Sequence, residues 1–154
     1  MNSINSTISR HCTSLSEHFQ ETYNLLNLRN LDRLDELYTH DVVFEDPFHR
    51  LEGLDSLKRY FGHLYRGVDS CQFDFSGRLE SEQQIALAWR MHLRLTRRPK
   101  ELITVNGSSF LTVRDGKISR HRDYFDAGEL VYERVPLLGS VIRRIKKLMK
   151  EQPS

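Results

Sequence analysis

The sequence has few of the features that mark membrane-spanning, nucleotide-binding or hydrolytic proteins. It contains no run of 18 apolar residues, so no membrane-spanning helix is expected. It also lacks the GxGxxG and P-loop motifs of nucleotide sites, the GxSxG motif of serine hydrolases and the HExxH motif of zinc proteases. These absences give no support to a nucleotide cofactor or to serine-based hydrolysis, and no cofactor is expected.

Cysteine is scarce as well, with Cys12 and Cys71 as its only occurrences and no CxxC pair. A reduced cytoplasmic protein without a disulfide is the expectation. The first 13 residues have no apolar core and do not read as a secretory signal. The seven histidines are scattered, so no metal site is expected, although His49 and His121 each have an aspartate nearby.

The sequence also lacks a large excess of charge of either sign, since 23 Lys and Arg residues nearly balance 21 Asp and Glu residues and the net charge is +2. This balance predicts no nucleic-acid binding. A hydrophobic content of 38% and a charged content of 29% are typical of soluble globular proteins. The 154 residues suffice for one domain with a sizeable core.

Helical spacing of apolar residues dominates the first part of the chain. Ser14 and Glu17 form a capping-box pattern before a helix expected over 15–28. Asn30 is the expected N-cap of a second short helix over 31–38. Gly53 precedes a third helix, whose apolar stripe comprises Leu54, Leu57, Phe61, Leu64 and Val68.

Strand-like patterns follow. Val42 to Asp46 reads as a short strand ended by Pro47. From residue 71 onward four alternating runs appear, CQFDF, QIALAWRMHLRLT, LITVNGSSFLTV and KISRHRDYF, and Asp115-Gly116 marks a hairpin between the last two. The predicted fold class is α+β, with N-terminal helices packed on a strongly curved antiparallel sheet. The predicted organisation is a flexible tail over 1–13, a domain over 14–136 and a basic amphipathic helix over 137–154.

Two stretches, LYTHDVVFEDPFHRLEGLDSLKRYF and GSSFLTVRDGKISRHRDYFD, resemble a known superfamily. It is the cone-shaped α+β fold of nuclear transport factor 2, ketosteroid isomerase, scytalone dehydratase and the SnoaL-type polyketide cyclases. The resemblance runs from about residue 15 to about residue 133 and is closest to the SnoaL-like proteins. It implies a pocket between the helices and the concave face of the sheet. Because the fold hosts enzymes, ligand carriers and dimerisation modules, it does not select an activity.

Asp46 is the first candidate catalytic residue, because the resemblance places it where the isomerases have their general base. Strand alternation puts Asp46 and Phe44 on one face, toward the cavity, and Glu45 on the other, toward solvent. A carboxylate at the mouth of an apolar cavity can take a proton from a carbon next to a carbonyl. The alternative is that Asp46 only hydrogen-bonds backbone amides in the turn before Pro47.

The resemblance is incomplete at the residues that hold an oxyanion in the isomerases. The position of their tyrosine falls on Thr22, beside Tyr23, and the position of their protonated acid falls on Ser108. A hydroxyl is a weaker hydrogen-bond donor than a strongly acidic group. Steroid isomerisation is therefore not expected.

His121 and Asp123 form the second candidate cluster. Alternation places Ser119, His121, Asp123 and Phe125 on one face of a strand. The resemblance to the cyclases, which use an acid on a late strand as base, makes Asp123 the matching candidate. The alternative is a structural ion pair with Arg90 or Arg94 of a neighbouring strand.

The predicted ligand contacts come from several elements. Trp89 and Met91 line the cavity if their face is the concave one, and core packing is the alternative. The full predicted set comprises Tyr23, Phe44, His49, Tyr65, Trp89, Met91, Asn106, Ser108 and Phe125. Asn106 and Ser108 are expected to add polar contacts to the same cavity. The opposite face, with Ile103, Val105, Leu111 and Val113, is also apolar and would be covered by a homodimer.

The segment over 140–150 combines an apolar stripe with five basic residues and no acid. Such a helix can lie on an anionic membrane surface, or it can dock its stripe on the domain and leave its charges in solvent.

The prediction is a cofactor-free isomerase, cyclase or dehydratase that acts on a small apolar carbonyl or lipid-like compound, with Asp46, His121 and Asp123 as catalytic residues. The alternative is a non-catalytic carrier or scaffold module.

Overall fold

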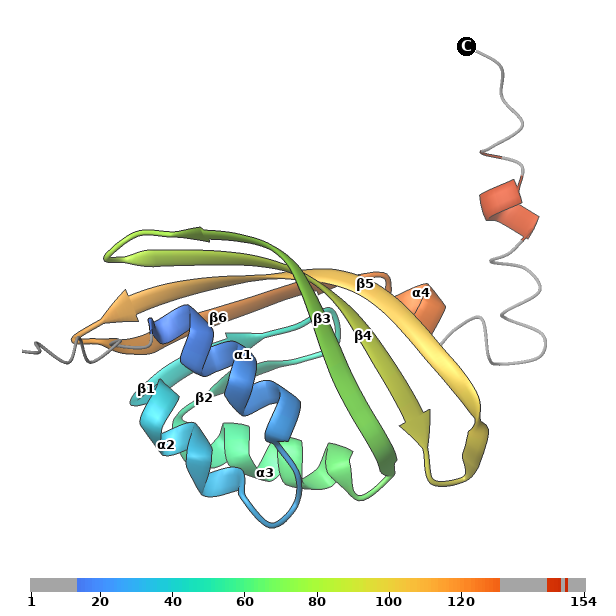
Figure 1. The fold of residues 1–154 in the computed structure, drawn as a ribbon, viewed down its shortest axis with the longest axis horizontal. Coiled ribbons are helices and arrows are strands. Elements are labelled where there is room, and N and C mark those ends of the chain that lie inside the picture. Colours follow the sequence, from blue (N-terminus) through green and yellow to red (C-terminus); the bar gives the residue numbers. More distant parts are fainter. Residues whose placement is uncertain (1–13, 131–143, 148, 150–154) are drawn as a thin grey trace, which may run out of the picture.

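A computed structural model describes residues 14–130, 144–147 and 149 (Figure 1). The elements, in chain order, are α1 (Leu15–Leu25), η1 (Leu31–Arg33), α2 (Leu34–Leu37), β1 (Tyr38–Glu45), β2 (Arg50–Glu52), α3 (Leu54–Tyr65), β3 (Val68–Glu80), β4 (Gln84–Leu95), β5 (Arg98–Arg114), β6 (Lys117–Phe125) and α4 (Ala127–Leu130). The predicted tail over 1–13 lies outside the described residues.

The six strands form one curved sheet in the order β2-β1-β6-β5-β4-β3. All neighbouring pairs are antiparallel except β1 and β6, which are parallel. Helices α1, α2 and α3 lie on the concave side of the sheet (Figure 1). The predicted α+β fold is confirmed, with the addition of one parallel pair.

The helices begin where their local chemistry predicts. Ser14 Oγ accepts from the backbone N–H of Glu17, and the Glu17 side chain accepts from the backbone N–H of Ser14, so the capping box is confirmed. Gly53, with a φ of 88°, turns the chain into α3 at a conformation that favours glycine. The first two helices are shorter than predicted. Asn30 is at the N-cap position of η1, as predicted, but its side chain makes no capping hydrogen bond because it bonds the backbone of Leu25 and Asn27 instead.

The hairpin between β5 and β6 contains an irregularity that decides which side chains face inward. Asp115 and Gly116 have φ values of 53° and 75°, which form the tight turn that the sequence predicts. Val113 pairs with Ile118, but Thr112 pairs with Arg120, so Ser119 is an extra residue in β6. This bulge shifts the alternation of β6 by one position.

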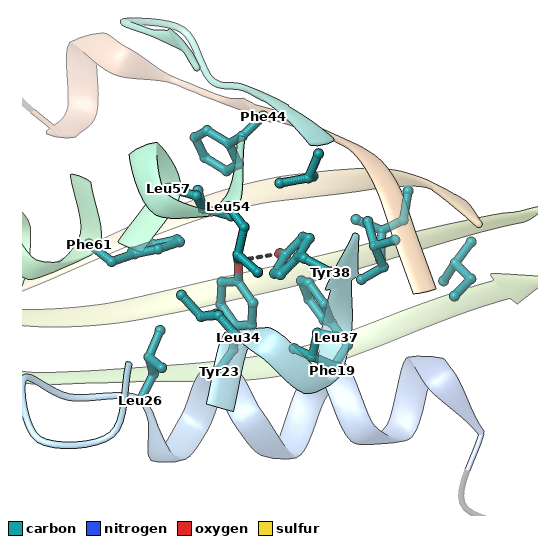
Figure 2. Packing of buried hydrophobic residues seen from close by; sticks show 14 of the residues in the cluster. Phe19, Tyr23, Leu26, Leu34, Leu37, Tyr38, Phe44, Leu54, Leu57 and Phe61 are labelled. Carbon is teal, nitrogen blue, oxygen red and sulfur yellow. Dashed lines mark hydrogen bonds between the residues drawn. The ribbon is translucent and has the colours of Figure 1, made fainter. Parts of the chain in front are cut away.

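The core lies between the three helices and the concave face of the sheet (Figure 2). Leu34, Leu37 and Leu57 are fully buried there. Complete burial of each such side chain stabilises the fold by roughly 1.5–3 kcal/mol. The short second helix is thus held mainly by packing, since a helix of this length is not stable alone.

The two faces of β5 differ from the sequence-based expectation. Ile103, Val105 and Leu111 are buried on the concave side, so they are covered within the chain and need no partner. The convex side exposes Phe110 and Tyr124, whose rings meet edge to face at 5.8 Å. The argument for a homodimer from a second apolar face is therefore wrong, and the homodimer itself stays a prediction.

Most of the segment over 137–154 lies outside the described residues. Residues 144–147 are helical, and Lys146 Nζ lies 2.6 Å from Asp126 Oδ2. Ile145 and Met149 are exposed. Contact of this segment with a membrane stays a prediction. Within the described ranges, no helix is long and apolar enough to cross a bilayer.

Candidate active site

A cavity of about 610 Å³ lies between α1, α3 and the concave side of β3 to β6. Its volume is in the range of small-molecule sites. Its walls are mainly aromatic and aliphatic, and its polar groups are those of Asp46, His49, Ser109 and Asp123, together with tyrosine hydroxyls and the thiol of Cys71. The lining comprises Phe19, Tyr23, Phe44, Asp46, Phe48, His49, Tyr60, Phe61, Leu64, Tyr65, Val68, Cys71, Phe73, Phe75, Trp89, Met91, Leu93, Ser109, Asp123 and Phe125.

Asp123 is a polar residue of the cavity wall whose carboxyl group is hydrogen-bonded by other side chains at only one of its two oxygens. His121 Nε2 lies 2.7 Å from Asp123 Oδ1, and Ser109 Oγ donates to the same oxygen at 2.5 Å. Among the described residues, Oδ2 of Asp123 has no hydrogen-bond partner. Because Asp123 lines the cavity, a ligand can reach this second oxygen.

Ser109 links Asp123 to the indole of Trp89. The Trp89 Nε1–H can only donate, and it lies 2.9 Å from Ser109 Oγ. The Ser109 hydroxyl is therefore free to give its own proton to Asp123. Strands β4, β5 and β6 each contribute one member of this set, so their register positions the carboxylate.

His121 is completely buried and both of its ring nitrogens are engaged. Its Nδ1 lies 2.7 Å from the hydroxyl of Tyr38, and that hydroxyl lies 2.6 Å from the hydroxyl of Tyr23. Burial is the main cause that raises the pKa values of both phenols well above the ordinary value. The imidazole thus sits between a carboxylate and a pair of protonated phenols.

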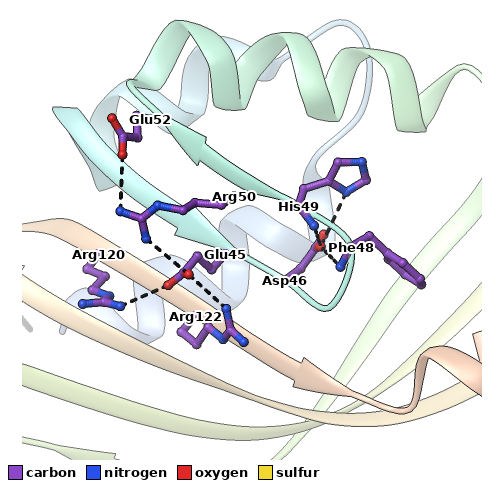
Figure 3. Close-up of polar contacts among 8 residues, drawn as sticks. All are labelled: Glu45, Asp46, Phe48, His49, Arg50, Glu52, Arg120 and Arg122. Atoms are coloured by element: carbon purple, nitrogen blue, oxygen red, sulfur yellow. Dashed lines mark hydrogen bonds and ion pairs between the residues drawn. The ribbon is translucent and has the colours of Figure 1, made fainter.

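Asp46 lines the same cavity, but both of its oxygens are occupied. Its Oδ1 accepts from the backbone N–H groups of Phe48 and His49, each at 2.7 Å (Figure 3). Its Oδ2 accepts from the hydroxyl of Tyr60 at 2.5 Å. The turn-forming alternative is thus realised at Asp46.

Tyr60 and Tyr65 are the phenols that α3 presents to the cavity. Burial, and then the hydrogen bond to Asp46, raises the pKa of Tyr60 above its ordinary value. Burial likewise raises the pKa of Tyr65. Tyr65 makes no hydrogen bond to any described residue through its hydroxyl, so that group is available to a ligand.

Glu45 departs from its prediction. Its side chain is 16% exposed and forms ion pairs with Arg50, Arg120 and Arg122 (Figure 3). The hydrogen bond from Arg120 is the main cause that lowers the pKa of Glu45. Its assignment to the face opposite Asp46 is correct, but the expectation of a solvated side chain is wrong, because β6 brings two arginines beside β1.

Seven of the nine predicted ligand contacts line the cavity, and two do not. Asn106 and Ser108 lie on the convex side of the sheet, where Asn106 accepts from Arg90 Nε at 3.1 Å. Their predicted place in the cavity is wrong. In the β4–β5 register Trp89 pairs with Gly107 and Leu87 pairs with Ser109, so the odd-numbered residues of β5 face inward.

The alternative ion pair between Asp123 and an arginine is also wrong. Arg94 donates to the carbonyl of Pro99, and Arg90 donates to Asn106 on the convex side. The predicted inward face of Ser119 is wrong as well, since the β6 bulge turns its hydroxyl to the carbonyl of Thr112.

Tyr38, Tyr60 and Ser109 are site residues that the sequence analysis missed. Ser109 was within reach, because it follows the alternation of Ile103, Val105 and Leu111 along one strand. Tyr38 was assigned to the end of a helix, and nothing in its local pattern indicates a contact with His121. Tyr60 lies on α3 three residues after Leu57. Its helical spacing indicates the buried face of the helix but does not indicate a hydrogen bond to Asp46.

Gly107 leaves the space that the indole of Trp89 occupies beside β5. A Cβ atom at this position would come within 2.2 Å of Cη2 of Trp89. Only glycine therefore permits the observed position of the ring and its hydrogen bond to Ser109.

The positions that correspond to the oxyanion residues of the isomerases contribute no donor to the cavity. Thr22 is fully buried, and its hydroxyl has no partner within the described chain. Ser108 lies on the convex side. Tyr23, next to Thr22 in the sequence, lines the cavity, but its hydroxyl is hydrogen-bonded to the hydroxyl of Tyr38.

The model of the SnoaL-like domain family matches residues 19–121, which include most of α1, all of α2, α3 and β1 to β5, and the first part of β6. The chain belongs to the SnoaL-like family. No curated protein sequence matches this SnoaL-like chain. In the part of the chain that the structure describes, no cluster of three His, Cys, Asp or Glu residues is placed to hold a metal ion.

Solved structures share the fold of this SnoaL-like protein at low sequence identity. An NTF2-like protein from Burkholderia pseudomallei K96243 has 15% identity and a TM-score of 0.67 over 76% of this chain and 94% of its own. A protein with a ketosteroid isomerase-like fold from Catenulispora acidiphila, in complex with trimethylamine, has 11% identity and a TM-score of 0.67 over 76% of this chain and 88% of its own. TerC, co-crystallised with polyporic acid, has 18% identity and a TM-score of 0.62 over 73% of this chain and 91% of its own.

Proposed function

We propose that this SnoaL-like protein binds a small, flat, apolar carbonyl compound and acts on it as a cofactor-free isomerase, cyclase or dehydratase. The observation that carries the proposal is the geometry of Asp123. One oxygen is fixed by His121 and Ser109, while the other has no hydrogen-bond partner among the described residues, and Asp123 lines an aromatic cavity. Such a carboxylate is placed to act as a general base.

In the proposed reaction, Asp123 Oδ2 takes a proton from a carbon next to the carbonyl of the ligand. The electron pair of the C–H bond moves toward the carbonyl oxygen and forms an enolate. Isomerisation is completed when Asp123 returns the proton to another carbon of the ligand. The Nε2–H of His121 keeps donating to Oδ1, which holds the carboxyl group in place through both steps.

Tyr65 is the proposed hydrogen-bond donor for the oxygen of the ligand. Tyr65 lines the cavity, and its hydroxyl has no hydrogen-bond partner among the described residues. Because burial raises its pKa, the phenol keeps its proton and can donate to a developing oxyanion.

Asp46 has a different role in this proposal. Its three hydrogen bonds fix the turn between β1 and β2 and anchor Tyr60. It shapes the cavity wall and does not abstract a proton.

The second candidate function is a carrier of an apolar ligand without chemistry. It is favoured by the predominantly aromatic wall and by the engagement of Asp46. TerC, with the same fold, was co-crystallised with polyporic acid, which supports a small-molecule ligand under either proposal. The two proposals differ in what Asp123→Asn does, because a carrier retains its affinity and has no turnover to lose.

The test uses 5-nitrobenzisoxazole, a flat apolar probe that a positioned base opens to a coloured phenolate. The base removes the ring C–H proton, the electron pair of that bond completes a C≡N triple bond, and the N–O bond breaks so that the oxygen leaves as the phenolate. We expect Asp123→Asn to slow the opening by about 10²–10⁴-fold. The matched control is Asp46→Asn, which keeps an Oδ1 acceptor for the two backbone amides and should retain the rate within a few fold. An Asp123→Asn variant as fast as the wild type contradicts the proposed base.

Homodimer formation and contact of residues 140–150 with an anionic membrane are proposals as well. Native mass spectrometry tests the first, and flotation with phosphatidylserine vesicles tests the second.

A further inference from the structure

Four side chains form a continuous hydrogen-bonded chain from the wall of the cavity through the core and back to the wall. Tyr23 contacts Tyr38 at 2.6 Å, Tyr38 contacts His121 Nδ1 at 2.7 Å, and His121 Nε2 contacts Asp123 at 2.7 Å. Tyr38 and His121 are at most 1% exposed, whereas Tyr23 and Asp123 line the cavity. Figure 2 shows the contact between the two phenols.

The possible directions of these hydrogen bonds follow from what each group can donate. A neutral imidazole has one N–H, so one ring nitrogen donates and the other accepts. If Asp123 is a carboxylate, Oδ1 can only accept, and Nε2 must then carry the proton. Nδ1 in turn accepts from the hydroxyl of Tyr38, whose oxygen accepts from the hydroxyl of Tyr23.

This arrangement satisfies every group in the chain with no donor left over. The opposite direction requires a proton on Oδ1 of Asp123, and it leaves the hydroxyl proton of Tyr23 without an acceptor among the described residues. Ser109 accepts from Trp89 Nε1–H and donates to Oδ1, so it adds a second donor beside Nε2–H. The match of donors to acceptors therefore sets the direction of the chain.

We infer that Tyr38, supported by Tyr23, is a positioning residue that acts through His121 on Asp123. Tyr38 holds the imidazole as the Nε2–H tautomer, and the imidazole holds Oδ1 of Asp123. Oδ2 is thereby left for the ligand in one orientation. The inference rests on the proposed role of Asp123, but its decisive test reads the histidine ring and needs no substrate.

The role of the two phenols goes beyond filling space. The rings of Tyr38 and His121 stack at 6.0 Å with an interplanar angle of 8°, so Tyr38→Phe can keep the packing and remove only the hydroxyl. Nδ1 of His121 then has no donor, and nothing favours one tautomer except Asp123. A buried acceptor without a partner is costly, so the ring is expected to move more.

The test is heteronuclear NMR on the ¹⁵N-labelled full-length protein without ligand. We expect Nε2 of His121 to carry the proton and Nδ1 to be unprotonated. In Tyr38→Phe, we expect the Nε2–H proton to exchange with solvent about 5- to 30-fold faster, as loss of one buried hydrogen bond implies. Tyr65→Phe, the same change at another cavity phenol outside the chain, should leave this exchange rate unchanged.

Two results would overturn the inference. One is a wild-type ring with its proton on Nδ1, and the other is an unchanged exchange rate in a folded Tyr38→Phe variant. If Tyr38→Phe does not fold, Tyr23→Phe replaces it, because it keeps the Tyr38–His121 bond and removes only the donor behind it. A smaller increase of the exchange rate is then expected, and no increase overturns the inference.

A kinetic readout separates this inference from the proposed function. With 5-nitrobenzisoxazole, Tyr38→Phe should lower kcat about tenfold with KM unchanged, because Asp123 is still present but less well oriented. If Asp123→Asn opens the probe as fast as the wild type, the proposed base is wrong, while the ring measurement still decides whether Tyr38 sets the tautomer.

Discussion

Gly107→Ala tests whether the site depends on the position of Trp89. The added Cβ would lie 2.2, 2.5 and 2.6 Å from three carbons of the indole, whereas nonbonded carbons are normally about 3.5–4.0 Å apart. The indole must therefore move away from the sheet. Gly107 does not have a positive φ, so the expected effect of the added Cβ is steric alone.

The magnitude combines two costs and one gain. Overpacking costs about 1–3 kcal/mol, and an indole N–H that loses Ser109 costs about 1–3 kcal/mol. Reduced freedom of the unfolded chain returns about 0.4–1 kcal/mol. We expect a net loss of about 1–5.5 kcal/mol and, at about 2–4 °C per kcal/mol, a Tm lower by about 2–22 °C.

The assay is thermal unfolding together with the fluorescence of Trp89, the only tryptophan in the chain. The matched control is Gly77→Ala on β3, whose new Cβ would meet only the Cβ of Ala88 at 3.5 Å, an ordinary contact. Adding Trp89→Phe to Gly107→Ala should recover part of the loss, since the smaller ring relieves the clash. A Gly107→Ala variant as stable as Gly77→Ala, with an unchanged emission spectrum, would refute the reasoning.

Two further predictions concern buried polar groups. Ser109→Ala should lower the free energy of unfolding by about 1–3 kcal/mol, because Trp89 loses its acceptor, while the neighbouring Ser108→Ala should change it by less than about 0.5 kcal/mol. Urea unfolding of both variants checks this, and equal effects would contradict the inward face of Ser109. Burial raises the pKa of the Cys71 thiol from 9.0 to about 12, and it also raises the pKa values of Tyr23 and Tyr38. The unfolded chain then releases protons that the folded chain keeps, so stability should fall as the pH rises above about 9, and a flat free energy of unfolding between pH 8 and pH 11 would contradict it.

The sequence determined most of the fold because the decisive signals are local. A capping box starts α1, a glycine starts α3, and Asp115-Gly116 joins β5 to β6. Period-2 alternation then gives the strands, and helices followed by strands give an α+β plan. Helix ends were less accurate, because packing and not local preference ends a short helix.

The candidate site was only partly predictable, because one extra residue in β6 shifts the β5–β6 register. This shift changes which residues of β5 lie on the same face of the sheet as Asp123. A regular hairpin from the Asp115-Gly116 turn would place Ser108 opposite Asp123, whereas the bulge at Ser119 places Ser109 there. The bulge has no sequence signal of its own, so Asn106 and Ser108 were assigned to the wrong side.

The sequence by itself identified His121, Asp123 and Asp46 as residues of interest, since a strand pattern fixes which neighbours share a face. Only the tertiary structure distinguished their roles. Asp46 is held at both oxygens by its own turn and by Tyr60, whereas Asp123 is held at one oxygen by residues 2 and 14 positions away. Contacts of Tyr38 with His121 span 83 residues, and such contacts depend on how strands and helices pack, which no local pattern records.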